Sequence, residues 1–231
     1  MNAYGYGFDP LYGMVLVVFA LSMLVQFRVR SVFKRYATVL SRNGYPAAHV
    51  ARALLDARGI YDVRIDRARG TLTDHFDPRT GVLALSDDVH DSSSIAALGV
   101  AAHEVGHVFQ KEDGYMPMRI RQSLLPVAQI GSYAAFPLFL LGIFLSMEPL
   151  ISIGIAVFIA VVFFYIVTLP VEFNASRRAI SALADGGYLT AGETGPAKKV
   201  LNAAGMTYIM AAIQAMLQLI RLLAMSGRRR S

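Results

Sequence analysis

The sequence predicts a mainly α-helical membrane protein with three to four membrane helices and a small cytoplasmic lobe of mixed α and β structure. Three uncharged, apolar runs are each near the length that crosses a bilayer as a helix: Leu11 to Phe27, Leu124 to Met147 and Leu150 to Leu169. Charged residues make up 16% of the 231 residues, against about a quarter in a soluble domain. Between the first and second runs, residues 28–122 mix short strand patterns with helical ones, which predicts the lobe.

The order of the runs divides the chain into five segments. They are an N-terminal membrane anchor (1–27), a cytoplasmic lobe (28–122), a transmembrane hairpin (123–169), a helix with a polar loop (170–200), and a C-terminal apolar or amphipathic helix with a basic tail (201–231). Glu148 and Pro149 form the turn of the hairpin, which returns the chain to the side that it left. The lobe and the segment after the hairpin are therefore expected on the same side of the membrane.

The charges beside the first run predict the orientation. Residues 1–10 carry the acidic Asp9 and no lysine or arginine, whereas four basic residues follow the run between positions 28 and 35. Because basic flanks stay in the cytoplasm, we expect an outside N-terminus and a cytoplasmic lobe. No small-residue cleavage site follows the run, so an uncleaved anchor is expected rather than a signal peptide.

Composition excludes several other classes of protein. The chain has no cysteine, which removes disulfides, thiolate zinc sites and cysteine nucleophiles. The formal net charge is +6, and in a membrane protein such charge indicates topology and contact with anionic lipid. Basic residues are not interleaved with aromatic ones on a soluble face, so no nucleic-acid partner is expected.

The last apolar segment, Leu201 to Met225, allows two placements. Gln214, Gln218 and Arg221 fall on one stripe of a helix. The helix could lie in the membrane interface, or it could span with the stripe facing the other helices. The basic tail at 228–230 favours a cytoplasmic C-terminus and hence the interfacial placement.

The lobe is expected to hold a small sheet and two helices. Three short stretches carry strand patterns separated by turn signals, which predicts a small, mainly antiparallel sheet: Ile60 to Ile65, Leu72 to Phe76, and Val82 to Leu85. Helices are expected over 47–57 and over Ile95 to Gln110, with Ser94 among the candidate N-caps. Val82 to Leu85 could be an edge strand that pairs with an extended peptide.

Two histidines and a glutamate in the second of these helices form a pattern with specific chemistry. Residues four apart lie on one face of a helix, so His103 and His107 can hold one Zn²⁺. Glu104 then lies beside the open position of the metal, where it can accept a proton from bound water and deliver it to the leaving amine. Gly106 sits between the ligands, where a bulky side chain could obstruct the site. The alternative is a pair of surface histidines with an adjacent glutamate.

A third zinc ligand is expected downstream. A catalytic zinc usually has three protein ligands, and no histidine follows His107, so a carboxylate is the remaining choice. The candidates are Glu112, Asp113, Glu148, Glu172, Asp185 and Glu193. Glu172 is best placed, because it emerges from the third run on the cytoplasmic side at the level of the histidines. The first two candidates lie too close along the same helix, Glu148 lies across the membrane, and the last two lie in glycine-rich sequence. The alternative for Glu172 is an ion pair with Arg177 or Arg178.

Four stretches together carry a family resemblance: Ala101 to His107, Leu169 to Ala179, Leu72 to Arg79, and Leu201 to Ala204. They resemble the YugP-like family of neutral zinc metallopeptidases of prokaryotic membranes, and the similarity runs from about Arg28 to the C-terminus. More distantly, the order of helix, hairpin and Glu-x-x-Ala is similar to HtpX-type membrane proteases of the gluzincin class.

The resemblance implies a zincin-like lobe with zinc held by His103, His107 and Glu172. The third ligand of the distant family is the glutamate of Glu-x-x-Ala-Asp, which falls on Glu172. Ser176 stands where the distant family has Asp, and Asn174 stands where the nearer family often has Asp. In the distant family that Asp is a partner of a zinc-bound histidine. Both departures concern the surroundings of the ligands and leave the ligands themselves unchanged.

The residues and the resemblance favour a membrane-embedded zinc endopeptidase acting on cytosolic or membrane-associated proteins. Its expected partners are a protein or peptide substrate and the lipid bilayer, and a homo-oligomer or membrane-protein partner stays open. It is expected in the prokaryotic inner membrane as a multi-pass protein, with the active site on the cytoplasmic side. Asp74 and His75 could contact substrate or steady a developing oxyanion, or they could flank a polar turn.

Two other classes of function fit the sequence less well. A non-enzymatic scaffold or chaperone-like partner could keep a structural zinc site, but such a site needs no general base like Glu104. A transporter is less favoured, because buried charges would be expected in its spans and the first three runs carry none.

Overall fold

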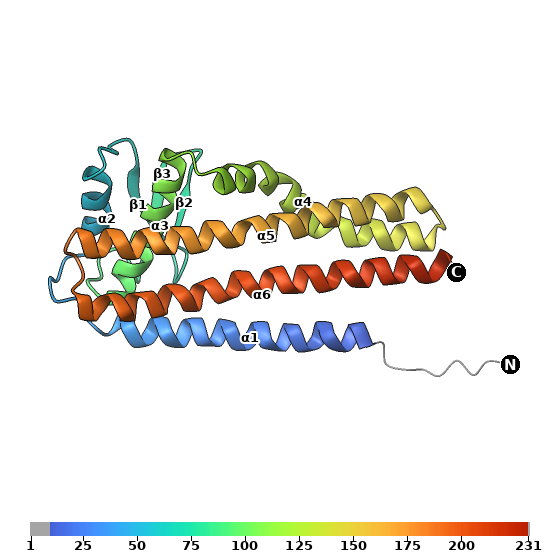
Figure 1. Ribbon diagram of the computed structural model, residues 1–231, viewed down its shortest axis with the longest axis horizontal. Helices are drawn as coiled ribbons and strands as arrows, with labels where there is room; N and C mark the ends of the chain where they lie inside the picture. Colours follow the sequence, from blue (N-terminus) through green and yellow to red (C-terminus); the bar gives the residue numbers. More distant parts are fainter. Residues whose placement is uncertain (1–9, 231) are drawn as a thin grey trace. The chain divides into compact units, whose positions relative to one another are not determined.

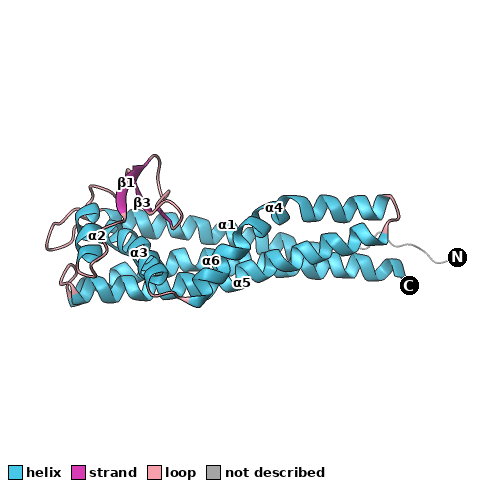
Figure 2. Cartoon of the chain, turned by 90° about the horizontal axis from the view of Figure 1, so that it is seen from above, coloured by secondary structure: helices cyan, strands magenta, loops and turns pink. Residues whose placement is uncertain are grey.

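The structure of the chain, a computed structural model, describes residues 10–230 (Figure 1). The chain divides into two compact units. One holds Met1–Val25, Ile120–Thr168 and Thr207–Ser231, and the other holds Gln26–Arg119 and Leu169–Met206. Asp9, on which the predicted orientation partly rests, lies outside the described residues. Strands are a small part of a mainly helical chain (Figure 2).

Four long helices contribute to the first unit. They are α1 (Pro10–Ala37), α4 (Met116–Phe144), α5 (Glu148–Asp185) and α6 (Ala191–Arg230). By length and composition all four could cross a membrane. Four membrane-length helices therefore agree with the three to four that the apolar runs predict.

Small residues allow close packing inside this first unit. A Cβ on Gly154 would lie 2.9 Å from the carbonyl oxygen of Ala135, so α5 and α4 approach each other at backbone distance. Phe139 and Leu222 are fully buried in the apolar cluster that joins α4, α5 and α6. Close approach at small residues is typical of helix packing in membranes.

The second unit contains the sheet and the two short helices of the expected lobe. The helix α2 (Ala47–Asp56) precedes three strands, β1 (Arg64–Ala68), β2 (His75–Asp77) and β3 (Val82–Ser86), and α3 (Ile95–Glu112) follows them. The order in the sheet is β1-β3-β2, with β1 parallel and β2 antiparallel to β3. These elements gather around the end of α5 that carries Leu169–Asp185 (Figure 1).

The sheet corrects two sequence-based expectations. It is evenly mixed rather than mainly antiparallel, and β3 is the central strand, so the expectation of an edge strand at Val82–Leu85 is wrong. The physical reason is the burial of the side chains. The side chains of β3 are almost wholly buried, whereas β1 carries exposed charged residues. An unbroken apolar run is typical of a strand covered on both faces.

Helix α3 lies in the core of the second unit. Ser94 caps its N-terminus, with the side-chain oxygen accepting a hydrogen bond from the backbone N–H of Ala97, as the N-cap preference predicts. Most of its side chains are buried, in a cluster that also takes residues from α2, β3, α5 and α6. The core around this helix therefore joins segments from both sides of the hairpin.

Two helices run further than the sequence suggests. The stretch 170–200 was expected to hold a helix and a polar loop, but α5 continues through Pro170 to Asp185 and α6 begins at Ala191. The break between them is short and contains Gly187, whose φ of 70° suits a residue without a side chain. Glu172 therefore lies within a continuous helix rather than at the start of one.

Candidate metal centre

Two imidazoles project from one face of α3. His103 and His107 are one turn apart, their ring centroids are 4.8 Å apart, and their planes are nearly perpendicular. His107 is buried and His103 is partly buried. The helical spacing alone brings these two rings together, so this half of the site is local in the sequence.

The third group comes from α5. The Glu172 Oε2 atom lies 3.1 Å from the His103 Nε2 atom and 3.6 Å from the His107 Nε2 atom. The side chain of Glu172 is 2% exposed. One ligand atom from each of these three residues lies within 4.8 Å of the others, so among the described residues they form a group that could hold a metal ion.

The outer nitrogen of each imidazole has a hydrogen-bonding partner. The His103 Nδ1 atom lies 3.1 Å from the Ser176 hydroxyl oxygen, and the His107 Nδ1 atom lies 3.0 Å from the Gln110 Oε1 atom. Both Nε2 atoms are therefore left to face Glu172. Two imidazole nitrogens and one carboxylate oxygen are a ligand set that zinc takes in catalytic sites, with a fourth position open to water or substrate. The residues present fit zinc.

Glu104 lies in α3 next to His103. It is 8% exposed, and no hydrogen bond to its carboxylate is found within residues 10–230. Burial raises the pKa of Glu104 to about 7, although the nearby His103 acts in the opposite direction. Glu104 is thus a buried carboxyl group outside the candidate metal group.

The other candidate carboxylates lie elsewhere. Asp113 forms ion pairs with Arg58 and Arg178. Glu193 accepts hydrogen bonds from the backbone and hydroxyl of Thr190. None of Glu112, Asp113, Glu148, Asp185 and Glu193 belongs to the candidate metal group in the described part of the chain. Arg178, an alternative partner for Glu172, pairs with Asp113 instead.

Asp74 and His75 lie at the start of β2. The Asp74 carboxylate accepts hydrogen bonds from the backbone N–H and the hydroxyl of Ser86. Burial raises the pKa of Asp74, and these hydrogen bonds act against the rise. Asp74 thus links the start of β2 to the end of β3. This favours a structural role for Asp74 beside the turn over a contact with substrate.

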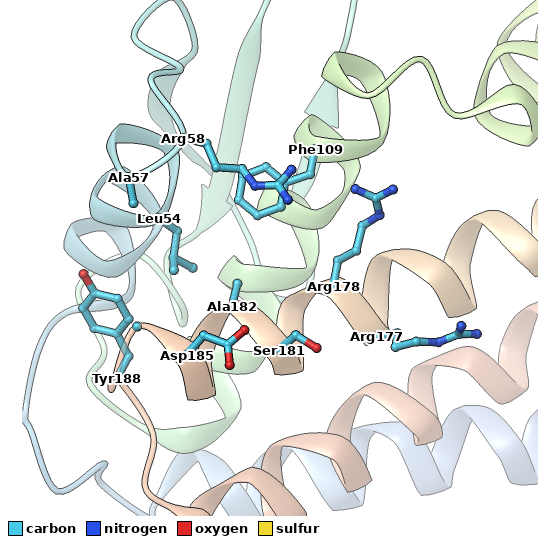
Figure 3. Close-up of a pocket in the computed structure, with 11 residues that line it drawn as sticks. Leu54, Ala57, Arg58, Phe109, Arg177, Arg178, Ser181, Ala182, Asp185 and Tyr188 are labelled. Carbon is cyan, nitrogen blue, oxygen red and sulfur yellow. The ribbon is translucent and has the colours of Figure 1, made fainter.

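A cavity of about 490 Å³ lies apart from the four site residues. It is lined by residues of α2, α3 and α5 and by Tyr188 (Figure 3). The basic side chains of Arg58, Arg177 and Arg178 reach it, but neither histidine of the metal group nor Glu172 does. The candidate metal centre is therefore identified by its ligand geometry and not by the size of a cavity.

Sequence reasoning missed Gln110. Its position three residues after His107 on the same helix could have indicated a contact with that imidazole. Its contacts with α5 could not be derived from spacing, because they join residues 61 and 64 positions apart in sequence and depend on how the two helices pack.

Comparison with known proteins adds an independent finding. Residues 11–227 match the protein family described as "putative neutral zinc metallopeptidase". The chain is 42% identical over 208 residues to the "putative membrane protease YugP" of Bacillus subtilis (strain 168), covering 90% of this chain and 92% of that protein. No solved structure matches the chain.

Proposed function

Because the chain belongs to the family of neutral zinc metallopeptidases, we propose that it is a membrane-embedded endopeptidase of the gluzincin type. It hydrolyses peptide bonds of cytosolic or membrane-associated proteins, and its active site, in a zincin-like lobe, faces the cytoplasm. Zinc is its cofactor, and His103, His107 and Glu172 are the proposed ligands. The similarity to a protein described as a putative membrane protease and the four apolar helices support this proposal.

One observation carries the proposal: the convergence of Glu172 with the two histidine Nε2 atoms beside Glu104. Zinc, when bound there, supplies a Lewis acid that polarises a carbonyl group and lowers the pKa of water. The histidines and Glu172 orient their ligand atoms toward one point, and the second helix is needed for that convergence. Three protein ligands leave room for the reacting groups.

Glu104 is the proposed general base. Its carboxylate lies on the same helix as the histidines and is free of hydrogen bonds within residues 10–230. It can accept a proton from the attacking water and later donate that proton to the leaving amine. A serine or cysteine nucleophile is not needed.

The edge of the sheet offers a place for the substrate backbone. Since β3 is central, the strand that lies against α3 at an edge is β2 (His75–Asp77), and its far side has no neighbouring strand among the described residues. An extended peptide could add to this edge by backbone hydrogen bonds. We therefore propose that β2, and not β3, pairs with the substrate backbone.

The non-enzymatic alternative makes a different use of the same ligands. A structural zinc site is usually closed by four protein ligands, whereas three converge here. A scaffold would also have no use for a buried carboxyl at position 104. These two features favour the enzyme.

Glu104→Gln in the full chain in detergent tests the proposal. The variant should retain zinc, measured by mass spectrometry, and lose nearly all cleavage of casein or a peptide, because it removes the base and no ligand. Glu112→Gln on the same helix, at an exposed position, is the control and should leave both unchanged. Full turnover by the Glu104→Gln variant would rule out this mechanism.

A further inference from the structure

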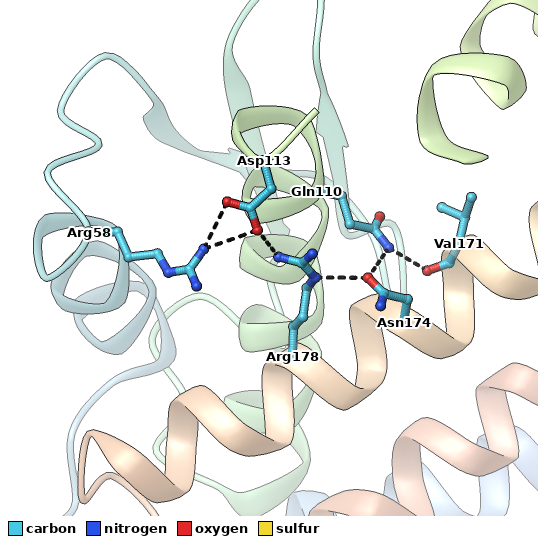
Figure 4. A network of polar contacts seen from close by, with 6 residues as sticks. All are labelled: Arg58, Gln110, Asp113, Val171, Asn174 and Arg178. Atoms are coloured by element: carbon cyan, nitrogen blue, oxygen red, sulfur yellow. Dashed lines mark hydrogen bonds and ion pairs between the residues drawn. The ribbon is translucent and has the colours of Figure 1, made fainter. Parts of the chain in front are cut away.

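Gln110 connects the candidate metal centre to α5. Its side chain is fully buried. The Nε2 group donates to the backbone carbonyl of Val171 at 2.7 Å and to the Asn174 Oδ1 atom at 3.0 Å, while its Oε1 atom lies 3.0 Å from the His107 Nδ1 atom (Figure 4). Both donors of the Gln110 NH₂ group are thus directed at α5, and the Gln110 oxygen is directed at the imidazole.

The hydrogen bonds that run from Arg178 through Asn174 and Gln110 to His107 allow one assignment of donors and acceptors. A guanidinium group can only donate, and the Arg178 Nε group donates to the Asn174 Oδ1 atom at 2.8 Å. The Asn174 oxygen is therefore an acceptor. Because this same oxygen also faces Gln110, Gln110 must present its NH₂ group there and its oxygen to His107. An amide oxygen can only accept, so the hydrogen of this contact must come from His107 Nδ1.

Ion pairs hold Arg178, the first donor in this series of hydrogen bonds, in place. Arg178 pairs with Asp113 at the end of α3, and Asp113 also pairs with Arg58 at 3.4 Å. These contacts are drawn together in Figure 4. The guanidinium that sets the direction is consequently tied to the same helix that carries the histidines.

The Nδ1 atom of His103 has no comparable control. Its Nδ1 atom contacts the Ser176 hydroxyl, and a hydroxyl can donate or accept. That contact is compatible with either tautomer of the ring. In the metal-free protein the Nε2 atom of His103 lies 3.1 Å from the Glu172 carboxylate, which can only accept, so that contact sets a proton on Nε2. The two imidazoles of the candidate centre thus differ in whether their Nδ1 contact fixes a proton.

We propose that Gln110 and Asn174 are positioning residues that hold His107 with a proton on Nδ1, so that Nε2 is the nitrogen left for zinc. The consequence for zinc rests on the function proposed above. A ligand fixed in the metal-binding tautomer needs no rearrangement on binding, and such outer contacts commonly contribute 10- to 100-fold to metal affinity. Neither residue touches the metal or the substrate.

The first experiment measures the tautomer directly in the metal-free protein. The full chain in detergent is labelled with ¹⁵N-histidine, and two-bond ¹H–¹⁵N correlations, assigned with a His107→Gln sample, report which ring nitrogen carries the proton. His107 should carry it on Nδ1 without any metal. A His107 ring without a proton on Nδ1 would overturn the proposal, whether or not the chain is a peptidase, so the two proposals can fail separately.

The second experiment compares substitutions at position 174. Asn174→Asp keeps an oxygen that accepts from Arg178 and Gln110, whereas Asn174→Leu removes it. By zinc competition titration, the Leu variant should bind about 10- to 100-fold more weakly, with an altered visible spectrum of the Co²⁺-substituted protein, and the Asp variant should match wild type. Asn202→Leu, at an exposed position on α6, controls for the loss of an amide. Equal affinities of the Asp and Leu variants would contradict the proposal, and the tautomer measurement decides it if the Leu variant does not fold.

Discussion

Gly106 lies directly against the backbone of Ala175. A Cβ atom placed on Gly106 would come within 2.6 Å of the Ala175 carbonyl oxygen, a separation that real Cβ atoms essentially never show. Backbone cannot move aside as a flexible side chain can. Gly106 therefore allows α3 and α5 to approach closely at the position directly before His107, and Glu172 lies about one turn before Ala175 on the facing helix.

Gly106→Ala should damage both stability and the metal centre. The added methyl group must push α5 away from α3, and overpacking of this kind costs about 1–3 kcal/mol of unfolding free energy. The same displacement moves Glu172 away from His103 and His107. We expect a lower thermal midpoint and weaker zinc binding, measured on the full chain in detergent.

The control for this substitution lies on the same helix. A Cβ on Gly99 would meet Ala197 at 3.7 Å, which is ordinary contact. Gly99→Ala should therefore leave zinc affinity unchanged, with stability equal or slightly raised by the better helix propensity of alanine. If both variants bound zinc like wild type, the close approach at Gly106 would have no bearing on the site.

The two halves of the candidate site differ in how far the sequence predicts them. His103, Glu104 and His107 belong together because of helical spacing, which is local. Glu172 is 65 residues from His107, and its placement followed from the expected hairpin and from the family resemblance. The sequence did not predict the contacts of Gln110 with α5, because they depend on the packing of α3 on α5. Neither periodicity nor spacing carries information about that packing.

The sheet shows a similar division. Only β3 begins where the sequence pattern predicts a strand, whereas β1 and β2 begin four and three residues later than the expected stretches at Ile60 and Leu72. The order of the strands could not be derived from three short segments. The continuous apolar sequence of Val82–Leu85 in fact indicates burial on both faces, and hence a central strand. The polar, glycine-rich composition within 170–200 suggested a loop after a helix, yet α5 continues to Asp185 because one face of that stretch, including Ala179 and Leu183, packs into the core.

Glu172→Gln tests the third ligand. The substitution keeps the shape of the side chain and removes the negative charge that a zinc ligand supplies, so zinc affinity should fall by at least about 100-fold. Asp185→Asn removes an exposed carboxylate from the same helix and should have no effect. Competition titration with a chelator measures both. A Glu172→Gln variant with wild-type affinity would require another ligand.

Single-cysteine labelling tests the predicted orientation. The chain has no cysteine, so one introduced thiol is the sole target. In intact cells, a membrane-impermeant maleimide should label Met147→Cys at the turn of the hairpin and should not label Asp88→Cys in the lobe. Both positions are exposed, so both should react once the membrane is permeabilised. Labelling of Asp88→Cys in intact cells would invert the topology.

The last prediction concerns the need for the hairpin. The core around α3 includes buried residues from beyond the hairpin, on α5 and α6: Ala179, Leu183, Ala197, Val200 and Leu201. A chain that ends at Gln122 keeps His103 and His107 but loses these side chains and Glu172. Losing the packing partners of even one large core side chain costs about 2–5 kcal/mol, comparable with the whole stability of a small domain. Two imidazoles alone also leave zinc without the carboxylate ligand. The truncated protein should therefore aggregate, retain little zinc and cleave nothing, whereas the full chain in detergent should stay monodisperse, bind zinc and cleave. A truncated lobe that proved soluble, zinc-loaded and active would show that the third ligand comes from within the lobe, with Glu112 or Asp113 the nearest candidates, and that Glu172 is not the ligand.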